Sequence, residues 1–170
     1  MKLLRTVVLF LFLTLPFCAC ETDDICVDGN TPLLVLGFYD FDDREVVKEV
    51  PSLVIRGDNG TGTALEALQL VVNDSNAVSV PLRPNIASTQ FILSQNQTPT
   101  DTTTVNNDRI TFSYDTLEEF KSRACGFVAN YDNVVAELAV EPDSLLWIRG
   151  IEIIAPLIEN SNETHVKIYH

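Results

Sequence analysis

Residues 110–114, with the sequence Ile-Thr-Phe-Ser-Tyr, form the stretch that decides the fold, because apolar and polar side chains alternate along it without a break. A period of two is typical of a β-strand that buries one face and exposes the other to water. The stretch therefore predicts a half-buried strand, and it sets the pattern by which the rest of the chain is interpreted.

Short apolar runs separated by Gly, Pro, Asn, Asp and Thr predict the other strands. They cover residues 33–39, 52–56, 78–82, 90–94, 127–140, 145–158 and 166–168. Pro81 predicts that its strand lies at a sheet edge, since proline cannot donate a ladder hydrogen bond. Residues 64–72 fit a helix by spacing and a strand by composition. About eight short strands with frequent turns indicate an antiparallel β-sandwich.

One short helix is expected after residue 114. Thr116 and Glu119 have the spacing of a capping box, and Cys125-Gly126 is typical of a helix end. Trp147 follows both later cysteines, so the Cys-Trp-Cys order of true immunoglobulin domains is absent. The predicted fold is an all-β, immunoglobulin-like antiparallel β-sandwich of about eight strands with one short helix, in a single domain over residues 31–170.

The composition narrows the class of protein. The chain has 170 residues, 24 acidic and 11 basic side chains, and a net charge of −13. This length fits one domain, and 46% hydrophobic residues are enough for a core. A nucleic-acid surface needs clustered Lys and Arg, so the acidic balance excludes nucleic acid as a partner.

The first 19 residues have the order of a secretory signal. Lys2 and Arg5 precede the apolar run 6–17, and small residues follow it. The run is about 12 residues long, too short for a bilayer core that needs roughly 20. This leader holds two of the basic residues and none of the acidic ones, so its removal leaves a more acidic chain.

The end of the leader resembles a bacterial lipoprotein signal, in which a small residue precedes the cysteine that is acylated. Ala19 precedes Cys20, which is therefore the expected lipidation site at the start of an acidic linker, residues 20–30. The resemblance implies a membrane partner and an outer-membrane location, held by acyl chains. Ordinary secretion with an unmodified Cys20 is the alternative.

Glu21, Asp23 and Asp24 follow at once. They resemble the acidic sorting signal that directs Bacteroidota lipoproteins to the outer face of the outer membrane. The alternative is a solvated linker on the periplasmic face.

Cys26 and Cys125 remain once Cys18 is cleaved off and Cys20 is acylated. In an oxidising compartment we expect them to form a disulfide, closing a loop of about 100 residues. A reactive thiol or a metal ligand is the alternative, but neither cysteine has a histidine near it and there is no CxxC.

No pattern of catalytic residues is present. The only histidines are His165 and His170, and the chain has neither GxSxG nor HExxH. We expect His165 to be an exposed strand residue, and we expect neither catalytic residues nor a cofactor. Asp40, Asp42 and Asp43 are weak candidates for Ca²⁺ ligands, but a solvated acidic loop is the favoured interpretation.

Three Asp-Ser/Thr segments resemble the O-glycosylation motif of exported Bacteroidota proteins. Their acceptor residues are Thr102, Thr116 and Ser144. Thr116 and Ser144 also suit caps or turns.

Several segments together resemble an uncharacterised family of Bacteroidota lipoproteins. They are residues 20–26, 31–33, 38–40, 80–83, 110–114, 122–127 and 165–170. The resemblance covers nearly the whole mature chain and implies a β-rich lipoprotein domain of unknown function. Cys26 and Cys125 both lie within these segments, which fits a structural bridge.

The expected function is that of a non-enzymatic binding or envelope-assembly module with an unknown protein or glycan partner. One alternative is a glycan-binding accessory lipoprotein, which would need exposed aromatic rings from among Tyr39, Tyr114, Tyr131, Trp147 and Tyr169. We expect Trp147 to lie in the core. An envelope hydrolase is the less favoured alternative.

Overall fold

The computed structural model describes residue 26 and residues 30–58, 64–72, 75–96, 105–139 and 146–170. This part of the chain contains nine strands. They are β1 (Leu34–Tyr39), β2 (Leu53–Asp58), β3 (Ala64–Val72), β4 (Ala77–Val80), β5 (Ser88–Gln95), β6 (Asn106–Ser122), β7 (Gly126–Leu138), β8 (Gly150–Ile153) and β9 (Val166–Tyr169). The predicted all-β class is confirmed.

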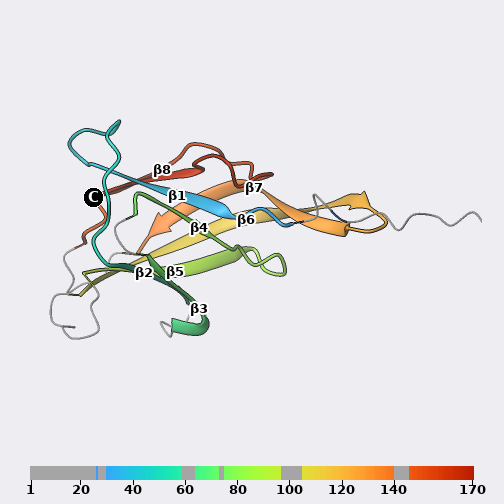
Figure 1. Ribbon diagram of the computed structural model, residues 1–170, viewed down its shortest axis with the longest axis horizontal. Coiled ribbons are helices and arrows are strands. Elements are labelled where there is room, and N and C mark those ends of the chain that lie inside the picture. Colours follow the sequence, from blue (N-terminus) through green and yellow to red (C-terminus); the bar gives the residue numbers. More distant parts are fainter. Residues whose placement is uncertain (1–25, 27–29, 59–63, 73–74, 97–104, 140–145) are drawn as a thin grey trace, which may run out of the picture.

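The strands form two sheets that pack as a sandwich (Figure 1). The smaller sheet has the order β4-β1-β9-β8, and the larger has the order β3-β2-β5-β6-β7. The paired strands are antiparallel except for β1 and β9, which run parallel. β4 lies at an edge, as Pro81 predicts.

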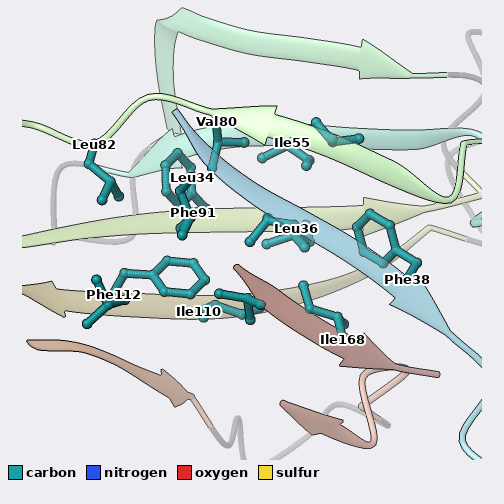
Figure 2. Packing of buried hydrophobic residues seen from close by; sticks show 14 of the residues in the cluster. Leu34, Leu36, Phe38, Ile55, Val80, Leu82, Phe91, Ile110, Phe112 and Ile168 are labelled. Carbon is teal, nitrogen blue, oxygen red and sulfur yellow. The ribbon is translucent and has the colours of Figure 1, made fainter. Parts of the chain in front are cut away.

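The core lies between the sheets, and the alternating stretch contributes to it as predicted. Ile110, Phe112 and Tyr114 are buried, while Ser113 between them is exposed. Leu34, Leu36 and Phe38 of β1, Phe91 of β5 and Ile168 of β9 also belong to this cluster (Figure 2). β1 is an interior strand of its sheet, which explains why its apolar run is continuous.

Polar ends of large core side chains find partners. The Tyr131 hydroxyl donates to the Leu82 carbonyl at 3.1 Å, and burial raises the Tyr131 pKa to about 12. Trp147, buried as predicted, donates its indole N–H to the Leu93 carbonyl at 3.3 Å. These two aromatic side chains are therefore buried in the core with their polar atoms hydrogen-bonded.

The short helix predicted from Thr116 and Glu119 is wrong, because β6 continues through this segment to Ser122. Strand β7 pairs with it residue by residue and supplies the backbone hydrogen bonds that a helix would otherwise make internally. The Glu119 carboxylate on β6 accepts a hydrogen bond from the Asn130 side-chain amide on β7 instead of capping a helix. Gly126, with φ of 70°, begins β7 after the turn.

Two further assignments differ from the sequence analysis or go beyond it. Of the predicted strand over residues 145–158, only Gly150–Ile153 is a strand among the described residues, which begin at 146. Residues 64–72, which fitted either state, form β3 beside β2. Hydrogen bonding to β2 at the edge of the larger sheet makes this segment a strand and not a helix.

His165 is wholly buried, so the prediction of an exposed strand residue is wrong. Its Nδ1 accepts the Val35 backbone N–H at 3.0 Å, and the His165 backbone N–H donates to the Val35 carbonyl at 3.0 Å. These two bonds extend the contact of β1 with the chain just before β9. Desolvation lowers the pKa of His165, so the folded protein holds it neutral.

This burial predicts that stability decreases in mild acid. In the unfolded chain the imidazole titrates near 6.5, whereas the folded state resists protonation. As the pH falls below that value the unfolded state binds the extra proton, and stability drops by at most about 1.4 kcal/mol per pH unit for one histidine. His165→Asn, which keeps an acceptor for Val35, is expected to flatten the pH dependence of urea unfolding between pH 6.5 and 5. Because burial also lowers the pKa of His170, the comparison is made in a His170→Asn background, which removes the contribution of that residue. An unchanged slope in His165→Asn would contradict the assignment.

Candidate functional site

The outer end of the β6–β7 hairpin extends beyond the rest of the sandwich along its longest axis (Figure 1). We call residues 117–127 the ribbon tip. A register irregularity between Ser113 and Asp115 separates it from the core half of the hairpin, and Asn133 opposite has a φ of 53°. The Asn133 side chain donates to Asp115 at 2.9 Å. The tip is therefore a continuation of the larger sheet past a bulge.

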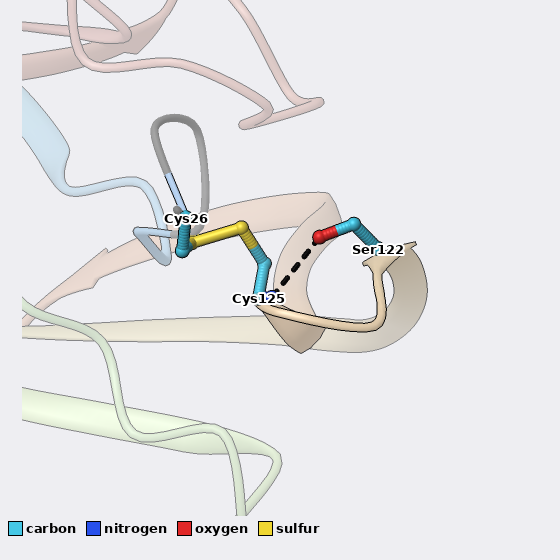
Figure 3. Close-up of a disulfide and its surroundings, with 3 residues drawn as sticks. All are labelled: Cys26, Ser122 and Cys125. Carbon is cyan, nitrogen blue, oxygen red and sulfur yellow. Dashed lines mark hydrogen bonds between the residues drawn. A yellow bond between two sulfur atoms is a disulfide. The ribbon is translucent and has the colours of Figure 1, made fainter. Parts of the chain in front are cut away.

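Cys26 and Cys125 stand at disulfide distance at the tip, as predicted, with their Cα atoms 4.9 Å apart (Figure 3). The Ser122 hydroxyl accepts the Cys125 backbone N–H at 3.0 Å and fixes the turn that presents this cysteine. The Thr31 hydroxyl accepts the Ala129 N–H at 3.4 Å. The chain thus enters the sandwich from the ribbon tip before it becomes β1.

Two phenylalanines flank the turn of the tip and face solvent. Phe120 and Phe127 are directly paired across the two strands, with ring centroids 5.3 Å apart. Their side chains are 56% and 68% exposed, the latter the most exposed of the large apolar residues that the structure describes. Leu117 on the same ribbon is also exposed. The tip therefore presents an apolar surface outside the core.

Exposed charged residues of both signs lie in the same segment of the hairpin, namely Glu118, Glu119, Lys121 and Arg123. Lys121 and Arg123 are exposed, and the Lys121 ammonium lies 2.7 Å from the Glu119 carboxylate. The hydrogen bond from Lys121 lowers the pKa of Glu119, with a second contribution from Asn130. Arg123 lies in the turn between β6 and β7, so the outer end of the hairpin carries a positively charged side chain.

The loop after β1 lies at the opposite end of the sandwich (Figure 1). We call residues 40–49 the distal loop. Asp40 accepts the backbone N–H groups of Asp42 and Asp43 at 2.8 and 3.2 Å, and it pairs with Lys48 at 2.9 Å. The bond from Lys48 lowers the Asp40 pKa to about 2.

The weak metal candidates do not converge on a common point. Asp40 uses its oxygens to order the turn, while Asp42 and Asp43 contribute their backbone N–H groups to it. Among the described residues no group of three His, Cys, Asp or Glu side chains is arranged to hold a metal ion. The Asp40 carboxylate thus orders the acidic turn through the turn's own backbone N–H groups.

Cations and aromatic rings stack beside the distal loop. The Arg44 guanidinium lies 4.9 Å from the ring centre of Tyr169, and that of Arg149 lies 5.0 Å from the ring centre of Phe41. Val46 and Val47 next to them are about half exposed, at 51% and 52%. The distal end thus combines ordered charge with accessible apolar surface.

Several predicted site residues lie outside the described residues. They are Cys20, Glu21, Asp23, Asp24, Thr102 and Ser144. Thr116 is described and sits within β6, half-buried and paired with Tyr131. Its place is a strand interior and not the helix cap that its spacing indicated.

Phe120 and Phe127 were not singled out from the sequence. The predicted short helix contained Phe120 and the predicted strand over residues 127–140 contained Phe127, so their pairing was concealed. The signal that would have found them is their symmetric position about the turn at residues 123–125.

A model for a family of unknown function, DUF6452, matches residues 53–170. The chain belongs to this family. Its match takes in β2 to β9 with the whole ribbon tip and Cys125, but stops short of β1 and Cys26. The DUF6452 match transfers no activity or site residue, since the function of the family is unknown. Neither a curated protein nor a solved structure gave a significant match.

In the described ranges, no helix is long and apolar enough to cross a membrane.

The cysteine pair is expected to stabilise the fold. The two residues are 99 apart in sequence, and closing so long a loop contributes about 4.7 kcal/mol in the chain-entropy model. Cys26→Ser with Cys125→Ser should lower the free energy of unfolding in guanidinium by several times more than Ser122→Ala, which removes one hydrogen bond worth about 1 kcal/mol. Non-reducing mass spectrometry should show the Cys26 and Cys125 peptides linked. Two alkylatable thiols in the native protein would refute the bond.

Proposed function

We propose that the chain is a lipid-anchored outer-membrane protein of the DUF6452 family, acting without catalysis as a binding or envelope-assembly module. The anchor is placed at Cys20, after a leader of residues 1–19 with the order of a secretory signal.

The observation that carries the anchor is the pairing of the other cysteines. Of the four cysteines in the sequence, Cys18 falls within the leader and Cys26 stands at disulfide distance from Cys125. In a chain cleaved after residue 19, Cys20 then has no disulfide partner within the same chain. Acylation accounts for this leftover cysteine, and Ala19 before it suits the lipoprotein type of cleavage.

Support for a binding role comes from the distal loop. If the N-terminus is held at a membrane, the end of the sandwich away from the ribbon tip is the end that reaches outward (Figure 1). There Arg44, Val46 and Val47 lie on the distal loop next to the last strand, and Arg149, just before β8, stacks on Phe41 of this loop. Loops at the end of a rigid sandwich are a common place for recognition.

The two alternatives have weaker support. A glycan platform needs exposed rings, yet Tyr114, Tyr131, Trp147 and Tyr169 are buried, which leaves Tyr39 as the partly exposed member of the Tyr and Trp set. A hydrolase needs an accessible base, whereas His165 is buried and its Nδ1 is bonded to Val35.

Replacing the acylated cysteine tests the anchor. Cys20→Ala is expected to move the protein from the membrane pellet to the soluble fraction, since several acyl chains at about 0.8 kcal/mol per buried CH₂ are lost. Cys18→Ala, a change inside the leader, is the matched control and should remain in the pellet. Retention of Cys20→Ala in the membrane after a high-salt wash would defeat the anchor.

Protease shaving of intact cells tests surface display. We expect trypsin to cut at the exposed Arg44 in wild-type cells, and Glu21→Gln, Asp23→Asn and Asp24→Asn together to reduce this cleavage several-fold. The control neutralises three exposed acids elsewhere, Glu137, Glu159 and Glu163, by substitution with glutamine. Equal cleavage of wild type and the triple variant would remove the sorting role.

A further inference from the structure

The apolar pair at the ribbon tip is left largely uncovered by the residues that the structure describes. Phe120 and Phe127 are more than half exposed, although they contact each other across the strands. Paired aromatic rings held on a rigid hairpin are pre-organised for an external apolar phase, because little side-chain freedom is lost when they bind. The question is which surface covers them.

The position of the N-terminal segment points to the occupant. Cys26 is bonded to Cys125 at the turn between the two phenylalanines (Figure 3). Six residues lead back from Cys26 to Cys20, and a chain of that length spans at most about 20 Å. An acyl group on Cys20 would therefore hold the ribbon tip, and no other part of the sandwich so closely, next to the bilayer surface.

We propose that the ribbon tip docks on the lipid surface, with Phe120 and Phe127 in the interfacial layer of the bilayer. This inference rests on the proposed anchor at Cys20. Aromatic rings favour the membrane–water interface, where amphipathic and apolar side chains enter to about 5–10 Å. The exposed Lys121 and Arg123 balance Glu118 and Glu119 within the tip, so the side chains of residues 117–127 carry no net charge in a chain whose net charge is −13. The tip is therefore repelled by anionic headgroups less than the rest of the chain is.

A second copy of the chain fits the tip less well. Two phenylalanines from each of two copies would bury about 600–1,000 Å². Stable protein interfaces bury about 1,200 Å² or more. The pair of Arg123 residues brought together in such a contact would also repel each other.

The phenylalanines do not retain the protein by themselves. Their transfer into the interface supplies far less than several acyl chains do. Once the chain is anchored, however, the tip is at high effective concentration beside the bilayer, and a weak contact is enough to fix orientation. Docking of the tip then turns the distal loop away from the membrane.

Tryptophan fluorescence in vesicles tests the docking. The full acylated chain carrying Phe120→Trp is reconstituted into vesicles of phosphatidylethanolamine and phosphatidylglycerol that contain brominated lipids. Val135→Trp is the matched control, since Val135 is 62% exposed on the same ribbon but lies on the core side of the bulge. Trp147 is buried in both variants and gives a common background. Phe127→Trp repeats the measurement if Phe120→Trp does not fold.

Flotation and quenching report on separate claims. Co-flotation with vesicles reports the anchor, while several-fold stronger quenching of Phe120→Trp than of Val135→Trp supports docking. Equal quenching in a floating protein overturns the docking and leaves the anchor standing. If the full chain does not float, the anchor fails, and the same variants in a Cys18→Ala background are attached to vesicles by a thiol-reactive lipid at Cys20, where the quenching comparison decides docking alone.

A dimer broken by Phe120→Ser with Phe127→Ser, together with an unquenched Phe120→Trp, would assign the patch to a second copy and overturn the docking.

Discussion

The pairing of β6 with β7 is the interaction on which the rest of the structure depends. Its inner half places Ile110 and Phe112 in the core, where their burial holds the two sheets together. Its outer half continues past the bulge with the same ladder and carries the turn that presents Cys125. Because the same two strands are paired in both halves, the tip is held rigid by its continuity with the core half of the hairpin.

The second constraint is that the chain is held at both ends of β1. Before β1, the bond between Cys26 and Cys125 fixes the segment to the tip, and after it Asp40 and Lys48 order the distal loop. In between, His165 bridges the Val35 backbone to the chain that leads into β9. β1 lies outside the region that the family model matches, yet it separates β4 from β9 in the smaller sheet, so the folded unit is larger than the matched region.

The parts that the sequence predicted are those governed by local periodicity. Alternation at residues 110–114, the apolar run of β1 and the edge position marked by Pro81 each follow from the environment of one strand. The parts that it missed depend on distant partners. Thr116 and Glu119 satisfy a helix rule locally, but β7 offers them a ladder; His165 is buried through Val35, which is 130 residues away in sequence. Phe120 and Phe127 become one patch only when that ladder sets their register.

The same ladder explains why the molecule has two unlike ends. The larger sheet continues beyond the smaller one at the tip, so the apolar pair there lies outside the core, whereas at the other end the distal loop is closed by its own hydrogen bonds. The anchor proposed at Cys20 would act on a rigid body, because the disulfide joins Cys26 to the hairpin whose strands are packed in the core. A flexible tether alone would let the sandwich rotate freely. If the chain is anchored at Cys20 as proposed, a tether that ends at this apolar tip restricts the sandwich to one orientation, and that orientation exposes the distal loop.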